Sequence, residues 1–142
     1  MKTLVLERER IGKWVKDRIG LNGYWAADYQ AVAVERGGKL IAGVVYDRHS
    51  GNDCCMHVSG IGYWATPGTL RTFFSFPFMQ WKYQRVTALV ASKNHKCLTL
   101  VDRLGFTPEG RLREGLPNDD LMIFGMLRRE CRWLEEPHGQ VI

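Results

Sequence analysis

The sequence predicts an α+β fold, an α/β sandwich in which a mixed, mostly antiparallel sheet carries helices on both faces. Three observations predict it: apolar residues recur at helical spacing in several segments, other segments alternate or run apolar as strands do, and turn residues separate the two kinds. The expected order is a helix, three strands, a helix, a strand, a helix and two strands. An antiparallel meander that leads into two strand–helix crossovers and a closing hairpin gives such a mixed sheet.

The first half of the chain is expected to form a helix and a three-stranded meander. Leu6–Ile19 places apolar residues close to a 3.6-residue period, and Gly20 follows as a helix stop. A loop with Asn22 and Gly23 comes next, and Gly37–Gly38 marks a hairpin turn. Strands are expected in three ranges: 31–35, 39–46 and 54–61.

The second half begins with the clearest helical pattern of the chain. Its apolar stripe, which we interpret as core packing, consists of Leu70, Phe73, Phe74, Pro77, Phe78 and Trp81. Thr66 is the expected N-cap, Pro67 takes the first helical position, and Pro77 should kink or end the helix. A later helix opens at Asn94 and stops at Gly105. The remaining strands are expected at 85–91, 106–112 and 120–127.

The composition is that of an ordinary globular protein. The chain has 142 residues, of which 45% are hydrophobic and 25% charged, and its formal net charge is +5; disordered and fibrous classes are thereby excluded. No apolar run approaches the roughly 18 residues of a membrane span, and the early charges leave no secretory signal, so a cytoplasmic location is expected. Since the sequence contains no repeat and no linker, we expect one domain over residues 1–142.

The four cysteines predict free thiols, because their number and spacing do not make a disulfide framework. Cys54 and Cys55 would form half of a metal site only with a partner cluster, for which His57 is the sole candidate nearby, so a strand pair is favoured and no metal site is expected. Cys97 is interpreted as a core thiol and not as a nucleophile, because no base is identifiable beside it.

A series of short motifs follows in fixed order between about residues 54 and 134. They are Gly60-Ile61-Gly62-Tyr63-Trp64, Phe76-Pro77-Phe78, Arg85-Val86, Asn94, Leu104-Gly105-Phe106, Glu109-Gly110, Arg111-Leu112-Arg113, Asp120 and Met126-Leu127. This series resembles the GNAT superfamily of acyl-CoA N-acyltransferases, and within it the branch that includes the ribosomal-protein N-terminal acetyltransferases.

The resemblance implies a V-shaped cleft between the fourth and fifth family strands, where backbone groups bind the pantetheine arm of acetyl-CoA. The pyrophosphate would lie at the N-terminus of the next helix, whose first turn presents unpaired N–H groups to an anion. Gly68 would let a phosphate approach the backbone, and Arg71 would pair with it. Asn94 is either a helix cap, a contact with acetyl-CoA, or both. The implied acetyl-CoA-binding residues are Val58, Gly60, Ile61, Gly68, Thr69, Arg71 and Asn94.

Two departures from the family pattern keep a second hypothesis open. The phosphate loop retains only Gly68 of its glycine positions, and Pro67 removes one N–H group. The tyrosine with which many family members protonate the leaving thiolate is replaced by Val101. The first hypothesis is an acetyl-CoA-dependent N-acetyltransferase, and the alternative is a non-catalytic GNAT-like module that binds protein or nucleic acid.

Direct acyl transfer to a primary amine needs a base that works near neutral pH and donors that polarise the thioester. His57 is the candidate base, because it lies on the strand that borders the cleft and histidine titrates in this range; a hydrogen-bonded strand histidine is the competing interpretation. Asp53, Asp119 and Asp120 are either recruiters of a cationic amine or hairpin-end carboxylates. The acceptor, a small molecule or a protein amine, is not identified by any motif.

The basic C-terminal run from Arg128 to Trp133 raises the question of a nucleic-acid partner. Acidic residues are interspersed with the basic ones, and a site for the phosphates of CoA explains the same excess of charge, so nucleic acid is not favoured. No membrane partner is expected, and a homodimer is left open.

Overall fold

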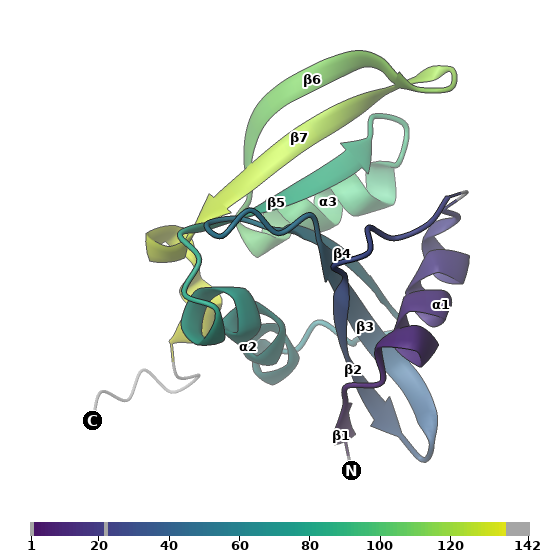
Figure 1. Cartoon of the computed structure of the whole chain (residues 1–142), viewed down its shortest axis with the longest axis vertical. Coiled ribbons are helices and arrows are strands. Elements are labelled where there is room, and N and C mark those ends of the chain that lie inside the picture. The colour runs from purple at the N-terminus through teal and green to yellow at the C-terminus, as the bar shows by residue number, and fades with distance from the viewer. Residues whose placement is uncertain (1, 22, 136–142) are drawn as a thin grey trace.

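The computed structural model describes residues 2–21 and 23–135, and these contain a seven-stranded sheet with the order β1-β2-β3-β4-β5-β7-β6 (Figure 1). The strands are β1 (Lys2–Val5), β2 (Gln30–Arg36), β3 (Lys39–Asp47), β4 (Cys55–Gly60), β5 (Arg85–Ala91), β6 (Thr107–Leu116) and β7 (Asp119–Leu127). Neighbouring strands pair antiparallel except β4 and β5, which are parallel. The predicted mixed, mostly antiparallel sheet is confirmed.

The α-helices are α1 (Arg8–Ile19), α2 (Pro67–Ser75) and α3 (His95–Leu104), and two short 3₁₀ helices follow β7 at Arg128–Glu130 and Arg132–Leu134. α1 stops at Gly20, whose φ of 72° is the left-handed conformation that glycine adopts without strain. Thr66 Oγ1 accepts a hydrogen bond from the Thr69 N–H at the start of α2, and Asn94 caps α3 in the same way. After α2, Pro77 interrupts the α-helical hydrogen bonds, and Phe76–Gln80 continues as a π-helical turn.

The helices cover both faces of the sheet, as expected. α1 packs on one face, where Ile11 and Val15 are fully buried against β2 and β3. α2 and α3 pack on the other face, where the largest core cluster contains Phe73, Phe74 and Phe78. These three aromatic side chains are 1% exposed or less, so the interpretation of the α2 stripe as core packing is confirmed.

Two strands differ from the sequence expectation. β1 was not anticipated: it has four residues, three of them exposed, and pairs with β2. β6 extends to Leu116 instead of ending at residue 112, and because it is an edge strand with almost every side chain exposed, no alternation marks its end. Asn22 lies outside the described residues. Within the described part of the chain, no helix has the length and apolarity needed to cross a membrane.

The sheet splits between β4 and β5. These strands share one register pair, Cys55 with Thr87, and the Thr87 N–H donates to the Cys54 carbonyl over 2.9 Å. From this point the two strands diverge, so the sheet opens as a V whose closed end lies at Cys55 and whose open end lies beyond Val58. The implied cleft between these two strands is therefore present in the fold.

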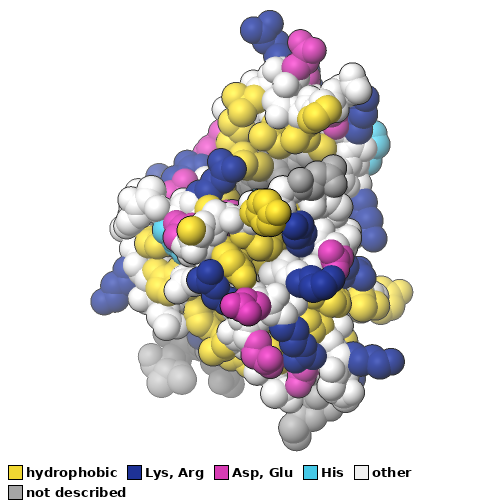
Figure 2. Space-filling view, turned by 45° about the vertical axis from the view of Figure 1, so that its right-hand side comes forward, with side chains coloured by type: hydrophobic (Ala, Val, Ile, Leu, Met, Phe, Trp, Pro, Cys, Tyr) yellow, Lys and Arg dark blue, Asp and Glu magenta, His cyan; other side chains and the backbone are white. Residues whose placement is uncertain are grey.

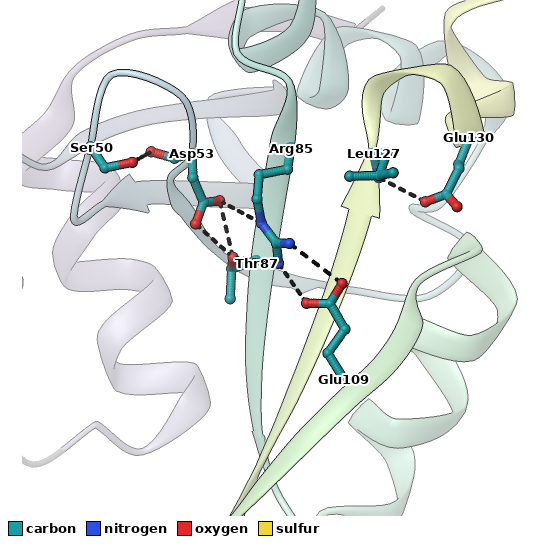
Figure 3. A network of polar contacts seen from close by, with 7 residues as sticks. All are labelled: Ser50, Asp53, Arg85, Thr87, Glu109, Leu127 and Glu130. Atoms are coloured by element: carbon teal, nitrogen blue, oxygen red, sulfur yellow. Dashed lines mark hydrogen bonds and ion pairs between the residues drawn. The ribbon is translucent and has the colours of Figure 1, made fainter.

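A polar network holds the closed end of the V together (Figure 3). Asp53, just before β4, accepts a hydrogen bond from the Thr87 hydroxyl on β5 over 2.9 Å. Arg85, also on β5, lies 3.6 Å from Asp53 and forms a 2.7 Å ion pair with Glu109 on β6. The ion pair crosses β7 at Gly125, where a Cβ atom would meet both charged groups. The network joins the two arms of the sheet at the closed end of the opening.

Candidate functional site

A cavity of about 620 Å³ occupies the opening between β4 and β5. Its walls come from the end of α1 with the following loop, the end of β3, the diverging strands, α2 with Trp64 before it, α3 with Phe106 after it, and the β6–β7 hairpin. Most of the lining is apolar. On the face that carries α1, hydrophobic side chains gather over the β6–β7 hairpin, whereas charged side chains dominate over α1 (Figure 2). Because its lining includes His57 on the α1 face and Phe73 of α2 on the other face, the cavity reaches both faces of the sheet where the sheet splits.

The backbone of β4 presents alternate peptide groups to this opening. The Ile61 N–H donates a hydrogen bond to the Ile41 carbonyl of β3. Because the peptide groups of an antiparallel strand point alternately to its two sides, those of His57 and Ser59 also face β3. Those of Val58 and Gly60 face the cleft. Arg18 of α1 donates to the Gly60 carbonyl over 2.9 Å, which leaves Val58 as the residue whose peptide groups border the cavity.

The His57 side chain points to the α1 face, where it meets Asp47 of β3. Asp47 is paired with Cys55 and Val45 with His57, so Asp47 and His57 are diagonal neighbours on one face of two adjacent strands. Asp47 Oδ1 lies 2.8 Å from His57 Nε2, and the ring of Trp25 lies against the imidazole with 4.9 Å between centroids. Both members of the pair line the cavity.

The charge state of Asp47 follows from its surroundings. Burial by itself would raise its pKa, but the hydrogen bond and charge of His57, the Ala26 N–H and the charge of Arg48 together bring the pKa below its ordinary value. An ionised carboxylate only accepts hydrogen bonds, so Nε2 of His57 must carry the hydrogen that lies between them. Nδ1 is then the nitrogen of the neutral imidazole that takes up a proton. This arrangement is that of a base held and oriented by a carboxylate.

The residues implied to bind acetyl-CoA fall in two places. Val58 and Asn94 line the cavity, and the Asn94 side chain also caps α3 through the Cys97 N–H at 3.1 Å. Gly68 and Thr69 instead line a separate hollow of about 260 Å³ between β1 and the start of α2, together with Lys2. A Cβ atom on Gly68 would meet nothing within 4 Å, so this helix start is accessible.

The other three implied residues have protein partners. Arg71 donates a hydrogen bond to the Leu134 carbonyl, which ties α2 to the C-terminal segment. Gly60 lies beneath the ring of Trp64, where a Cβ atom would overlap the indole. Ile61 is half exposed, at 52%, and its N–H is bonded to β3. The structure thus brings His57, Val58 and Asn94 together at the cavity and places the implied phosphate-binding residues outside it.

The remaining candidate residues have structural partners. Asp119 accepts a hydrogen bond from the Ser92 hydroxyl and Asp120 accepts one from the Glu114 N–H, which fits hairpin-end carboxylates.

All four cysteines are free thiols, as expected. Within the described ranges, no group of three or more His, Cys, Asp or Glu residues is placed to hold a metal ion.

Asp47 is the candidate site residue that the sequence did not reveal. The signal was present in the hairpin, because residues at the end of one strand and the start of the next lie opposite each other once the register is known. That register depends on how residues 48–54 turn, and no motif in this segment announces it.

The fold is shared with N-acetyltransferases of the GNAT superfamily. Spermidine/spermine N-acetyltransferase SpeG from Vibrio cholerae superimposes with a TM-score of 0.68 at 16% identity, over 89% of this chain and 92% of that one. A variant of SpeG gives a TM-score of 0.71 at 16% identity over 94% and 96% of the two chains. A dodecameric structure of the Vibrio cholerae spermidine N-acetyltransferase gives 0.68 at 16% identity over 89% and 94%.

No protein-family model and no curated protein matches the sequence. At these low identities the structural likeness establishes the GNAT fold. It does not single out the ribosomal-protein branch that the sequence motifs resemble.

Proposed function

We propose that this chain is an acetyl-CoA-dependent N-acetyltransferase, which moves an acetyl group from the thioester to a primary amine by direct attack. The observation that carries the proposal is the Asp47–His57 pair in the wall of a cleft that the divergence of β4 and β5 creates. The fold supports it, because the spermidine N-acetyltransferases with which the chain superimposes have the same architecture.

The cleft fits an extended thioester arm. The Val58 peptide groups face the opening, where an amide-containing arm would complete the hydrogen bonds that a neighbouring strand would otherwise make. Apolar side chains of α2 and α3, such as Leu70 and Val101, give methylene groups a dry surface. Asn94 would contact the arm where α3 begins. Acetyl-CoA would supply the activated acetyl group.

The phosphates of acetyl-CoA would be bound mainly by groups other than the Arg71 guanidinium. The first turn of α2 offers the N–H group of Gly68, and Lys2 lines the same hollow, whereas the Thr69 N–H is bonded to Thr66 Oγ1. Arg71 already binds the Leu134 carbonyl, so its guanidinium is directed to the C-terminal segment. This proposed arrangement agrees with the phosphate loop of the sequence, which retains only Gly68 of its glycine positions.

His57 would take the proton from the attacking nitrogen at Nδ1, while Asp47 holds Nε2–H and stabilises the imidazolium that forms. The new C–N bond forms as the C–S bond breaks, and the proton on His57 can pass to the departing thiolate. The products are an acetylated amine and a free thiol, so protons balance without a separate acid. The valine at position 101, where many family members have a tyrosine, is compatible with this route.

The test is the release of free thiol from acetyl-CoA in the presence of amines, with His57→Gln compared to His95→Gln. His95 is an exposed histidine at the start of α3 that does not line the cavity. We expect His57→Gln to lower kcat by about 10²- to 10⁴-fold without weakening acetyl-CoA binding, and His95→Gln to have no effect. Equal activity of the two variants would refute the role of His57. A folded wild-type protein that binds no acetyl-CoA would favour the alternative, a non-catalytic binding module.

A further inference from the structure

The part of the cavity that lies on the His57 side has an apolar wall. Cys55 and Thr87 are in register and His57 is two residues beyond Cys55, so Leu89 and Ala91 of β5 point to the same face as His57. Leu121 of β7 is paired with Ala91 and shares this face. Further apolar lining comes from both ends of the opening: Ile19, Leu21, Trp25, Leu116 and Pro117. An amine attacking beside His57 would therefore have its carbon skeleton among apolar groups.

Charged groups are scarce around this space. Among the described lining residues, the acidic and basic side chains are Asp47, Arg48 and His57. The Asp47 carboxylate already accepts hydrogen bonds from His57 and from the Ala26 N–H. Arg48 is a cation. No carboxylate of the described lining is left to pair with a second ammonium group.

A polyamine would bring such a second ammonium. Placing it in an apolar space without a carboxylate is unfavourable, because the charge loses its hydration and gains no partner. The acidic residues first considered as amine recruiters do not help: Asp53, Asp119 and Asp120 lie outside the cavity lining and have protein partners.

We infer that the acceptor of this chain is a primary amine on an apolar or aromatic body with no second cationic group, and not a polyamine. This inference rests on the proposed acetyltransferase function. It separates the chain from the superimposed structures, whose names specify spermidine, although the fold is the same.

The test compares kcat/KM for 2-phenylethylamine, spermidine and a lysine-containing peptide, after calorimetry has measured acetyl-CoA binding. We expect 2-phenylethylamine to exceed both of the others by at least about tenfold. Saturable acetyl-CoA binding combined with a preference for spermidine or for the peptide would overturn the acceptor assignment alone. Lack of acetyl-CoA binding would remove the proposed function and this inference together.

A designed variant tests the reason for the preference. Leu116→Asp adds a carboxylate to the cavity wall near the β6–β7 turn, whereas Leu112→Asp adds the same charge on the same strand at a side chain that is 49% exposed and outside the lining. We expect Leu116→Asp to raise the ratio of spermidine to 2-phenylethylamine kcat/KM by about tenfold relative to wild type, and Leu112→Asp to leave it unchanged. Equal ratios in the two variants would overturn the inference.

Discussion

The Asp47 carboxylate and the His57 imidazole lie 2.8 Å apart across two neighbouring strands, at the wall of the opening between β4 and β5. Their side chains are 5% and 19% exposed, so the pair is shielded from solvent on most sides but reaches the cavity. A carboxylate that fixes one imidazole nitrogen leaves the other for proton transfer. The register of the β3–β4 hairpin thus places Asp47 beside His57 at the cleft, where the pair could transfer a proton.

Asp47→Asn tests this link. An amide is neutral and can present its NH₂ group to Nε2, so the variant loses both the charge that stabilises the imidazolium and the preference for one tautomer. We expect kcat at pH 7 to fall by about 10²-fold with little change in acetyl-CoA affinity, as measured by thiol release and calorimetry. The control is Asp17→Asn, which removes an exposed carboxylate that pairs with Lys13 on α1; a similar fall in this variant would contradict the assignment.

The lowered pKa of Asp47 predicts that the effect of Asp47→Asn on the free energy of unfolding depends on pH. Because the pKa of Asp47 is lowered in the folded protein, its ionised form stabilises the fold above the unfolded-state pKa of about 3.9, and this stabilisation is lost as the pH falls through the lower folded value. The difference in unfolding free energy between wild type and Asp47→Asn should therefore be largest near neutral pH and shrink below about pH 4. Urea unfolding at several pH values measures it. A difference that grows on acidification would show that the pKa is raised.

Gly125→Ala should destabilise the junction of the two sheet arms. A Cβ atom there would meet the Arg85 guanidinium and the Glu109 carboxylate, so the ion pair must move (Figure 3). We expect the free energy of unfolding, measured with a chemical denaturant, to fall by about 1–3 kcal/mol. Gly68→Ala is the matched control, since its Cβ has open space and alanine favours helix. Equal stability of the two variants would contradict the conclusion that the ion pair requires a residue without a side chain at position 125.

The cysteines should react slowly with thiol reagents in the folded protein. Burial raises the pKa of Cys55 to about 11 and raises those of Cys54, Cys97 and Cys131 as well. At pH 8 about one Cys55 in a thousand is then a thiolate. We expect slow labelling by a disulfide reagent under native conditions and four fast thiols after denaturation. A fast-reacting thiol in the native state would contradict this environment.

The elements with capping signals were predictable from the sequence. Gly20, Thr66, Asn94 and Gly105 stop or start helices where the structure has them, because capping depends on one side chain and its nearest backbone groups. β1 was missed because a four-residue edge strand with three exposed side chains has no period to detect. The end of β6 was missed for the same reason.

The candidate site was predictable in part. His57 could be selected by its residue type and its strand, but its partner Asp47 depends on a register that the loop between them sets. The residues implied for phosphate binding lie at the start of α2, where the helical pattern predicted a helix, yet the direction of the Arg71 side chain depends on Leu134, 63 residues away. Contacts of this range are properties of the folded chain.

Calorimetric titration of the wild-type protein with acetyl-CoA tests whether the cleft between β4 and β5 is an acetyl-CoA site. We expect saturable binding with about one site per chain, and an increase in unfolding free energy of about 2.7 kcal/mol at 100 times the dissociation constant. The absence of binding and of thermal stabilisation at millimolar acetyl-CoA, in a protein shown to be folded, would contradict this expectation.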